Sequence, residues 1–415
     1  MKSILIIVPY DEVYPPMNGG MQRCFNIIHQ LAKYFNLTLI INQHKAAFLK
    51  SVTNYPAIAN VKVYSTHDVP AIKDVFNFGP RKFQKSLRYR WLKKQLNGPA
   101  DDMFLQYYSV LVKLLKQQTF DIVILENLAS LNAVSVIRKY DKQVKIIYDA
   151  HNVDSNLAAV GAIKWALNEE ELLLINKVEQ SLSENVNAIL ACSKNDLDDF
   201  IEMNKNSLPG VVIPNGVSVA NSLVEEGVKM QKPEYILFCG ILWSTPNTEG
   251  LHWFYKNSWP VVQKSFPGLK LLVVGGGKLP ADMEALYADS SLQFTGAVED
   301  VKPWYNKAAI AIVPLLSGSG TRLKILEAMS LGLPVISTSK GAEGISYTDG
   351  ANIIIADKEV EFAHEVMSLL NDKDKRKAIQ QSARKLVEEQ YDWDVIGTTL
   401  STYLNTELYK KEITF

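Results

Sequence analysis

The stretch Ser317–Pro334 reads Ser-Gly-Ser-Gly-Thr-Arg-Leu-Lys-Ile-Leu-Glu-Ala-Met-Ser-Leu-Gly-Leu-Pro, and it indicates the fold of the chain. An apolar run at residues 309–315, typical of a buried strand, precedes it. After the glycines the apolar residues recur at helical spacing, until Gly332 and Pro334 predict a helix end. A strand, a glycine-rich turn and a helix in this order are typical of an anion-binding site in α/β proteins.

The glycine-rich turn suits a phosphate group. Gly318 and Gly320 can adopt positive φ and let the backbone approach a ligand closely. Ser319 or Thr321 is predicted to cap the helix that follows. The amides of the first helical turn and the helix dipole then favour an anion at this point.

Two basic residues stand at the start of the predicted helix, where cations are unfavourable unless an anion is bound. Arg322 and Lys324 add full positive charge beside the amides. Glu327 comes about one and a half turns into the helix, within reach of ribose hydroxyls just beyond the phosphates. Each residue alone is also compatible with an ordinary solvated helix, whereas together they favour a nucleoside diphosphate.

This stretch resembles the donor-site signature of retaining GT-B glycosyltransferases, in particular glycosyltransferase family 4, also called group 1. The resemblance implies that Glu327 binds the ribose. It also implies that the loop and helix start hold the diphosphate, through Gly318, Ser319, Gly320, Thr321, Arg322, Leu323 and Lys324. The commonest form of the motif has a second glutamate, and this chain has Ser319 at that position.

Length and composition indicate an ordinary globular protein of two domains. The chain has 415 residues, of which 47% are hydrophobic and 21% charged. Its 44 basic and 44 acidic residues balance, so its charge gives no reason to expect a nucleic-acid partner. Three cysteines, Cys24, Cys192 and Cys239, lack metal-site spacing and are expected to be thiols in a reducing compartment.

The start of the chain is predicted to be a strand and not a signal peptide, because its apolar run is short and ends at Pro9. No segment approaches the roughly 18 apolar residues that a membrane-spanning helix needs. A cytoplasmic location is therefore expected.

The resemblance implies an α/β architecture of the GT-B type: two Rossmann-like doubly wound domains face each other across a cleft, and a C-terminal helix crosses back to the first domain. Residues 1–215 are predicted to form the N-terminal acceptor-binding domain. The polar and weakly patterned residues 216–233 are predicted to be a linker, and residues 234–392 the nucleotide-sugar-binding domain. Residues 393–415 are predicted to form the helix that packs back on the N-terminal domain.

The first predicted strand, Ile4–Val8, leads to two adjacent glycines and a helix from Met21 to Phe35. In the family, a Gly-Gly pair at this point lines the cleft and contacts the donor or the acceptor. The resemblance implies the same role for Gly19 and Gly20, although a tight turn explains the pair equally well.

His151 follows the predicted strand Val144–Tyr148, at the sheet edge where ligands bind in open α/β folds. Glu126 and Asp149 also come at predicted strand ends. The resemblance implies that His151 contacts the transferred sugar; the alternative is a loop histidine hydrogen-bonded to neighbouring backbone.

Asp196-Leu197-Asp198 has the Asp-x-Asp form of the metal motif of GT-A glycosyltransferases. These acids open a predicted amphipathic helix, Asp196–Met203, where the helix dipole explains them. No metal site is predicted.

Residues 73–96 interleave aromatic and basic residues, and no acidic residue occurs between Arg81 and Lys94. This composition suits an anionic membrane surface, so the protein is expected to associate peripherally with the inner face of the cell membrane. The alternative is that this segment folds on the domain and exposes its basic face to solvent.

Gly240 ends the first predicted strand of the second domain. Many relatives carry an Arg and a Lys in the loop that follows, where they clamp the diphosphate, whereas this chain has Ile241 and Asn247. The resemblance implies that Gly240 and Asn247 face the donor, and Arg322 and Lys324 are predicted to supply the two charges instead.

Two further positions of the second domain gain a role from the resemblance. The resemblance implies that backbone groups around Val298 contact the nucleobase. It also implies that Glu343 faces the sugar. The glycines 275–277 do not form a dinucleotide fingerprint, because Pro280 stands where its third glycine belongs, and a tight turn explains them.

The expected function is that of a metal-independent, retaining glycosyltransferase. It moves a sugar from a nucleotide-diphosphate sugar, a UDP or GDP sugar, to an acceptor such as a cell-surface polysaccharide or a lipid-linked glycan precursor. His151, Arg322, Lys324 and Glu327 are the expected catalytic residues, and the cations and helix amides would stabilise the leaving diphosphate without a metal or other cofactor. The alternatives are a nucleotide-sugar epimerase and a non-catalytic GT-B subunit of a glycosyltransferase complex, the latter suggested by the departures from the family motif.

Overall fold

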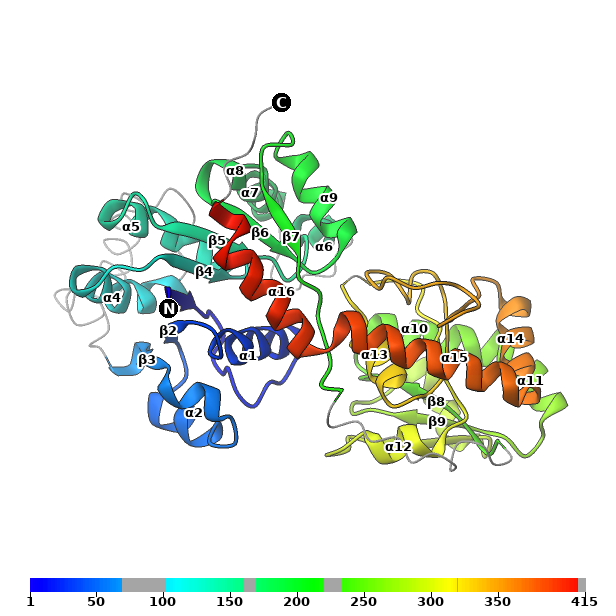
Figure 1. Cartoon of the computed structure of the whole chain (residues 1–415). Helices are drawn as coiled ribbons and strands as arrows, with labels where there is room; N and C mark the ends of the chain where they lie inside the picture. The colour runs from blue at the N-terminus through cyan, green and yellow to red at the C-terminus, as the bar shows by residue number, and fades with distance from the viewer. Residues whose placement is uncertain (69–101, 160–168, 220–232, 319, 410–415) are drawn as a thin grey trace. The chain divides into compact units, whose positions relative to one another are not determined.

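A computed structural model describes residues 1–68, 102–159, 169–219, 233–318 and 320–409 of the chain. The chain divides into two compact units: Met1–Ile213 with Gly397–Phe415 form unit 1, and Pro214–Ile396 form unit 2. Each unit is built on a parallel β-sheet with helices between successive strands (Figure 1). The predicted α/β class is therefore confirmed.

The sheet of unit 1 has the strand order β3-β2-β1-β4-β5-β6-β7. Because the order reverses between β1 and β4, this sheet is doubly wound, and ligands of such sheets bind beyond the carboxyl ends of the strands near the reversal. The strands are β1 (Ser3–Ile7), β2 (Asn36–Ile41), β3 (Lys62–Ser65), β4 (Ile122–Glu126), β5 (Lys145–Asp149), β6 (Ala188–Ala191) and β7 (Gly210–Val212).

Helices cover both faces of this sheet. The described ones are α1 (Gly19–Leu31), α2 (Lys45–Ser51), α4 (Asp102–Gln117), α5 (Ala133–Tyr140), α6 (Asp154–Ala159), α7 (Glu169–Gln180), α8 (Leu182–Asn185) and α9 (Lys194–Met203), with 3-10 turns at Pro56–Asn60, Thr66–Asp68 and Leu128–Asn132. Leu111 of α4 and Ile137 of α5 share one core cluster with Leu5 and Leu125 of the strands. Alternate strand residues therefore face the opposite side.

The C-terminal helix α16 (Trp393–Asn405) and the turn Glu407–Tyr409 follow unit 2, and from Gly397 the chain belongs to unit 1. A Cβ on Gly397 would lie 2.6 Å from Oε1 of Gln30 on α1, so the two helices are in close contact there. The Lys2 ammonium donates hydrogen bonds to the carbonyls of Leu404 (3.1 Å) and Asn405 (3.0 Å) at the end of α16.

The sheet of unit 2 has the order β10-β9-β8-β11-β12-β13. Its strands are β8 (Tyr235–Cys239), β9 (Lys270–Val274), β10 (Leu292–Gly296), β11 (Ile310–Val313), β12 (Val335–Ser337) and β13 (Ile354–Ile355). Separate apolar clusters cover its two faces. The helices are α10 (Thr245–Trp253), α11 (Trp259–Ser265), α12 (Lys302–Lys307), α13 (Leu323–Ser330), α14 (Glu359–Asn371) and α15 (Lys373–Leu386), with shorter turns at Phe254–Ser258, Ala281–Ala288 and Val387–Tyr391.

Three predicted features lie wholly or largely outside the described residues. These are the basic aromatic segment 73–96, residues 220–232 of the predicted linker 216–233, and Ser319. Among the described helices, none combines the length and the apolar character that crossing a membrane requires.

Candidate active site

The turn between β11 and α13 has the backbone conformation predicted for an anion loop. Gly318 has φ 92° and Gly320 has φ 80°, values that favour glycine. A Cβ on Gly318 would also lie 3.0 Å from Nη2 of Arg322 and 3.1 Å from the ring of Pro246. The loop therefore packs closely against the start of α10, with little room for a side chain at Gly318.

The predicted helix caps are wrong. The helix α13 begins at Leu323, with Arg322 at the N-cap position and without a capping hydrogen bond from that side chain. Oγ1 of Thr321 is buried and has no hydrogen-bond partner among the described residues, and Ser319 lies outside them. The reason is that the two positive-φ glycines prolong the turn, so the helix starts later than a serine or threonine cap would require.

Lys324 belongs to a tightly packed group at the carboxyl end of β8. Its Nζ donates a hydrogen bond to Oδ1 of Asn247 (2.7 Å), and Nδ2 of Asn247 donates in turn to the carbonyl of Ile241 (3.0 Å). A Cβ on Gly240 would lie 2.9 Å from Nζ of Lys324. Asn247 stands where many relatives carry a lysine, and in this structure it accepts a hydrogen bond from Lys324, one of the two cations predicted to supply the missing charges.

Arg322 and Lys324 both lie where burial disfavours a positive charge. Burial and, to a smaller extent, the neighbouring Arg322 lower the pKa of Lys324 to about 8. Burial also lowers the pKa of Arg322, against the attraction of Glu343. Nη2 of Arg322 donates to the carbonyl of Ser317 (3.4 Å), and Glu343 forms an ion pair with Lys340 (2.6 Å).

Glu327 lies one turn beyond Lys324 on α13. Burial raises the pKa of its carboxyl group, and Lys324 partly offsets that effect. Tyr305 of α12 is buried beside it and donates to the carbonyl of Lys324 (3.4 Å). Val298 and Leu323 are half-buried against the apolar cluster of this face, so their side chains contribute packing.

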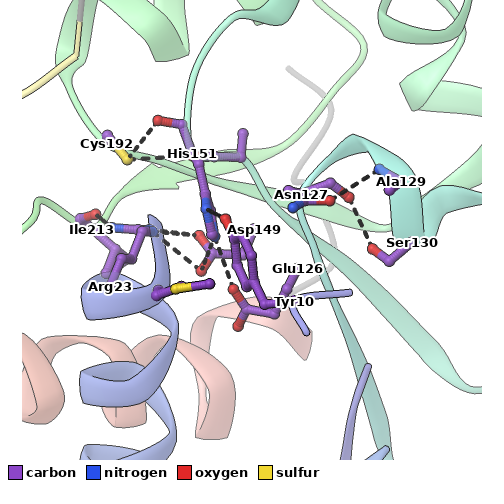
Figure 2. A network of polar contacts seen from close by, with 12 residues as sticks. Tyr10, Arg23, Glu126, Asn127, Ala129, Ser130, Asp149, His151, Cys192 and Ile213 are labelled. Atoms are coloured by element: carbon purple, nitrogen blue, oxygen red, sulfur yellow. Dashed lines mark hydrogen bonds and ion pairs between the residues drawn. The ribbon is translucent and has the colours of Figure 1, made fainter. Parts of the chain in front are cut away.

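A second charged group lies in unit 1, at the carboxyl ends of β4 and β5 (Figure 2). Glu126 and Asp149 are register partners on these neighbouring strands, and both are 0% exposed. Two carboxyl groups side by side in the interior require a compensating charge. Burial and the neighbouring Asp149 raise the pKa of Glu126.

Arg23 of α1 supplies that charge. Its Nε and Nη2 donate to Oδ1 of Asp149 at 3.0 and 2.5 Å, and its Nη1 donates to the carbonyl of Ile213 (2.6 Å). Although burial opposes the charge, Asp149 raises the pKa of Arg23. Sequence reasoning missed Arg23, because nothing in the pattern of α1 distinguishes it from a surface arginine.

His151 is held by side chains and not by neighbouring backbone. Its Nε2 lies 2.9 Å from Oε2 of Glu126 and its Nδ1 lies 2.8 Å from the Tyr10 hydroxyl (Figure 2). A Cβ on Gly20 would lie 2.4 Å from that hydroxyl, so this glycine makes room for the contact. Gly19 opens α1, which Asn18 caps by accepting from the amide of Met21 (2.9 Å).

Glu126, Asp149 and His151 bring ligand atoms within 4.8 Å of one another, a spacing also suited to a metal ion. In this structure Arg23 pairs with Asp149, and His151 is hydrogen-bonded to Glu126, so these side chains already have partners within the protein. The acids of the Asp-x-Asp sequence lie elsewhere: Asp196 accepts from the Ser193 hydroxyl (2.8 Å) and Asp198 pairs with Lys194.

Two family profiles match the chain. The family described as "Glycosyltransferase Family 4" matches residues 17–221, and the one described as "Glycosyl transferases group 1" matches residues 233–372. A protein of Klebsiella pneumoniae, described as "Uncharacterized 44.6 kDa protein in cps region", is 25% identical over 399 residues, covering 94% of this chain and 96% of its own length. The Staphylococcus aureus "Capsular polysaccharide biosynthesis glycosyltransferase CapM" is 23% identical over 256 residues, covering 58% of this chain and 66% of its own.

The fold has a solved counterpart in Anabaena HepE, crystallised in complex with UDP and glucose. The two structures superpose with a TM-score of 0.67 at 13% identity, over 98% of this chain and 100% of HepE. This likeness confirms the predicted GT-B fold. With a family match in each half, the chain belongs to the group 1 glycosyltransferases, family 4.

Proposed function

We propose that this glycosyltransferase moves a sugar from a UDP or GDP sugar to a glycan or lipid-linked acceptor in the synthesis of a cell-surface polysaccharide. It does so with retention of anomeric configuration and without a metal ion. The observation that carries the proposal is the pair of partly desolvated cations, Arg322 and Lys324, at the start of α13 beside Gly318 and Gly320.

The chemical demand of the reaction is the departure of a nucleoside diphosphate, on which negative charge develops. Fixed cations and helix amides stabilise that charge without reorganisation during the reaction, and such preorganised groups are often the largest catalytic contribution. Lys324, oriented by Asn247, and Arg322, at the N-cap, are placed to act in this way. A bound diphosphate would also favour the charged form of Lys324, against the burial and the repulsion from Arg322 that lower its pKa.

The remaining predicted residues take supporting roles in this proposal. Glu327 binds the ribose, and backbone groups near Val298 read the base. Glycines at 240, 318 and 320 admit the diphosphate because a side chain would fill the space or forbid the backbone conformation. Glu343 stays a predicted contact of the sugar, and Gly19 and Gly20 stay predicted contacts of the donor or the acceptor.

The comparisons support the donor and the acceptor classes. HepE was crystallised with UDP and glucose, and CapM is named for capsular polysaccharide biosynthesis. These are properties of those proteins, and the choice of a UDP or GDP sugar and of a polysaccharide acceptor is our proposal for this chain.

The double variant Arg322→Ala/Lys324→Ala tests the proposal. Because charge-assisted hydrogen bonds contribute about 1.5–3 kcal/mol each, we expect donor affinity to fall by at least about 100-fold in calorimetry with EDTA present. Lys385→Ala is the matched control, since it removes a cation of the same unit that is 72% exposed and paired with Glu389.

Unchanged affinity in the double variant would overturn the assignment of the diphosphate site. Failure of the unaltered protein to bind any UDP or GDP sugar would favour the non-catalytic subunit. Binding that requires magnesium would contradict metal independence alone.

A further inference from the structure

Tyr305 of α12 carries a hydroxyl group that lies in the interior of unit 2. The residue is 1% exposed and belongs to the apolar cluster that also contains Ile325 and Leu326 of α13. A buried tyrosine hydroxyl normally has a hydrogen-bond partner, because leaving it unpaired costs free energy. The groups around this hydroxyl therefore indicate what it does.

More than one acceptor lies within reach of this single donor. The hydroxyl donates to the carbonyl of Lys324 at 3.4 Å, which is longer than the roughly 2.5–3.0 Å of a typical O–H···O bond. It also lies within hydrogen-bonding reach of the Cys239 thiol and the Glu327 carboxyl group. A thiol is a weak acceptor, whereas a bond to a carboxylate is about twice as strong as a neutral one. Glu327 is therefore the acceptor that the Tyr305 hydroxyl stabilises most.

The Glu327 carboxyl group keeps capacity for a ligand beside this bond. Glu327 is half-buried on α13, whereas Tyr305 is enclosed. A carboxylate has two oxygens with about four acceptor positions, so one bond to Tyr305 leaves the others for hydroxyl groups of a ligand.

Lys324 is the charged neighbour that could draw Glu327 away from a ligand. The two residues lie three positions apart on α13, share a face of the helix, and favour each other's charge. In the described part of α13 they form no ion pair, and Nζ of Lys324 donates to Asn247 (2.7 Å) instead. Each of the two charged groups thus has a neutral partner from another helix, Asn247 for the ammonium and Tyr305 for the carboxyl group.

The electrostatics of Glu327 agree with this arrangement. Burial raises the pKa of its carboxyl group, whereas Lys324 and the hydrogen bond from Tyr305 lower that pKa. The bond from Tyr305 therefore favours the ionised form, in which both oxygens accept hydrogen bonds.

We propose that Tyr305 is a positioning residue of the donor site, whose buried hydroxyl holds the Glu327 carboxyl group in the orientation that accepts the ribose hydroxyls of the nucleotide. This inference rests on the proposed function, because it takes Glu327 as the ribose contact of a nucleotide sugar. All the residues that carry it belong to unit 2.

The test compares the unaltered protein with Tyr305→Phe in calorimetric binding of UDP and GDP, and of the 2′,3′-dideoxy form of whichever nucleotide binds. Tyr305→Phe keeps the ring in the apolar cluster and removes only the hydroxyl. The variant should bind the ribonucleotide roughly 5-fold more weakly, which is about the net contribution of one hydrogen bond. Both proteins should bind the dideoxy nucleotide equally, because it has no ribose hydroxyl for Glu327 to accept.

Tyr255→Phe is the matched control. It also removes a tyrosine hydroxyl that donates to a carboxyl group of unit 2, that of Asp289 (2.6 Å), and neither residue contacts Glu327. This variant should bind the ribonucleotide as the unaltered protein does.

The dependence of Tyr305 on Glu327 has its own readout. Tyr305→Phe/Glu327→Ala should bind the ribonucleotide no more weakly than Glu327→Ala alone, because Tyr305 acts through the carboxyl group that is then missing. Losses that multiply in the double variant would contradict the positioning role.

Normal binding of the ribonucleotide by Tyr305→Phe would overturn this inference and leave the proposed function intact. An equal loss for the ribonucleotide and its dideoxy form would also overturn it, because that result indicates a general structural role of the hydroxyl. If the unaltered protein binds neither UDP nor GDP, both proposals fail.

Discussion

A group of charged residues lies at the carboxyl ends of parallel strands in each unit, and the two groups differ in how their charges are balanced. In unit 1, the charge of Arg23 pairs with the buried carboxyl group of Asp149, and His151 is hydrogen-bonded to Glu126. In unit 2, Lys324 and Arg322 repel each other and donate hydrogen bonds to the neutral oxygens of Asn247 and Ser317, while Glu327 and Glu343 attract them.

The pKa shifts follow this difference. Asp149 raises the pKa of Arg23 and holds it charged, whereas burial and the neighbouring cation lower the pKa of Lys324 to about 8. A balanced group can hold a side chain such as His151 in one position without a ligand. The unit 2 cations, whose charge burial disfavours, would be stabilised by a bound anion, so this group has the character of a binding site.

Removing the compensating charge from unit 1 should have the largest effect on the molecule. Arg23→Met leaves Asp149 buried beside Glu126 without its partner, which should reduce the free energy of unfolding by about 3–5 kcal/mol in urea denaturation. Lys194→Met is the matched control: it removes an exposed ion pair with Asp198 and should change stability by less than about 0.5 kcal/mol. A loss in Arg23→Met as small as in the control would show that the unit 1 group is not held together by charge.

The unit 2 group should show a pH dependence that follows Lys324. Only its charged form attracts a diphosphate, and its pKa of about 8 in the unliganded protein lies below that of the complex, where an anion favours the charge. Donor affinity should therefore be constant below pH 8 and fall by up to about 10-fold per pH unit above it.

Lys324→Arg supplies the control for this pH effect, since a guanidinium stays protonated throughout that range. The variant should bind the donor with a flat profile from pH 7 to 9. A profile that falls equally in both proteins would assign the titration to another group.

The smallest effect is expected for Asn247→Ala. The variant removes the acceptor that orients the Lys324 ammonium, at a cost of about 1 kcal/mol or roughly 5-fold in donor affinity. Asn185→Ala, which removes an exposed amide in unit 1, should leave the affinity unchanged. Stronger donor binding after Asn247→Ala would mean that Asn247 competes with the diphosphate for Lys324.

The sequence predicted the fold well because its signals are local. Apolar runs and glycine turns recur in order, and the predicted strand Ile4–Val8 lies at Ser3–Ile7, one residue away. The helix predicted over Met21–Phe35 begins earlier, at Gly19, because Asn18 caps it, and it ends at Leu31. Capping of α13 was mispredicted for a related reason, since glycine conformations and not cap residues decide where that helix starts.

The site was predictable only in part. The positions of His151 and Lys324 after glycine turns and strand ends are visible in the sequence, whereas their partners are not. Tyr10 reaches His151 across 141 positions and Arg23 reaches Asp149 across 126, so these contacts depend on the assembled sheet. Asn247 and Lys324 are likewise 77 positions apart.

The central claim is that the cations at the start of α13 bind a nucleoside diphosphate sugar without a metal ion. The most direct measurement is thermal stabilisation of the purified protein by a panel of UDP, GDP, ADP and CMP sugars, with EDTA and with magnesium. We predict a selective rise in melting temperature with one diphosphate sugar in EDTA, a rise that Arg322→Ala/Lys324→Ala abolishes. No stabilisation by any sugar nucleotide, or the same stabilisation in the double variant, would contradict the claim.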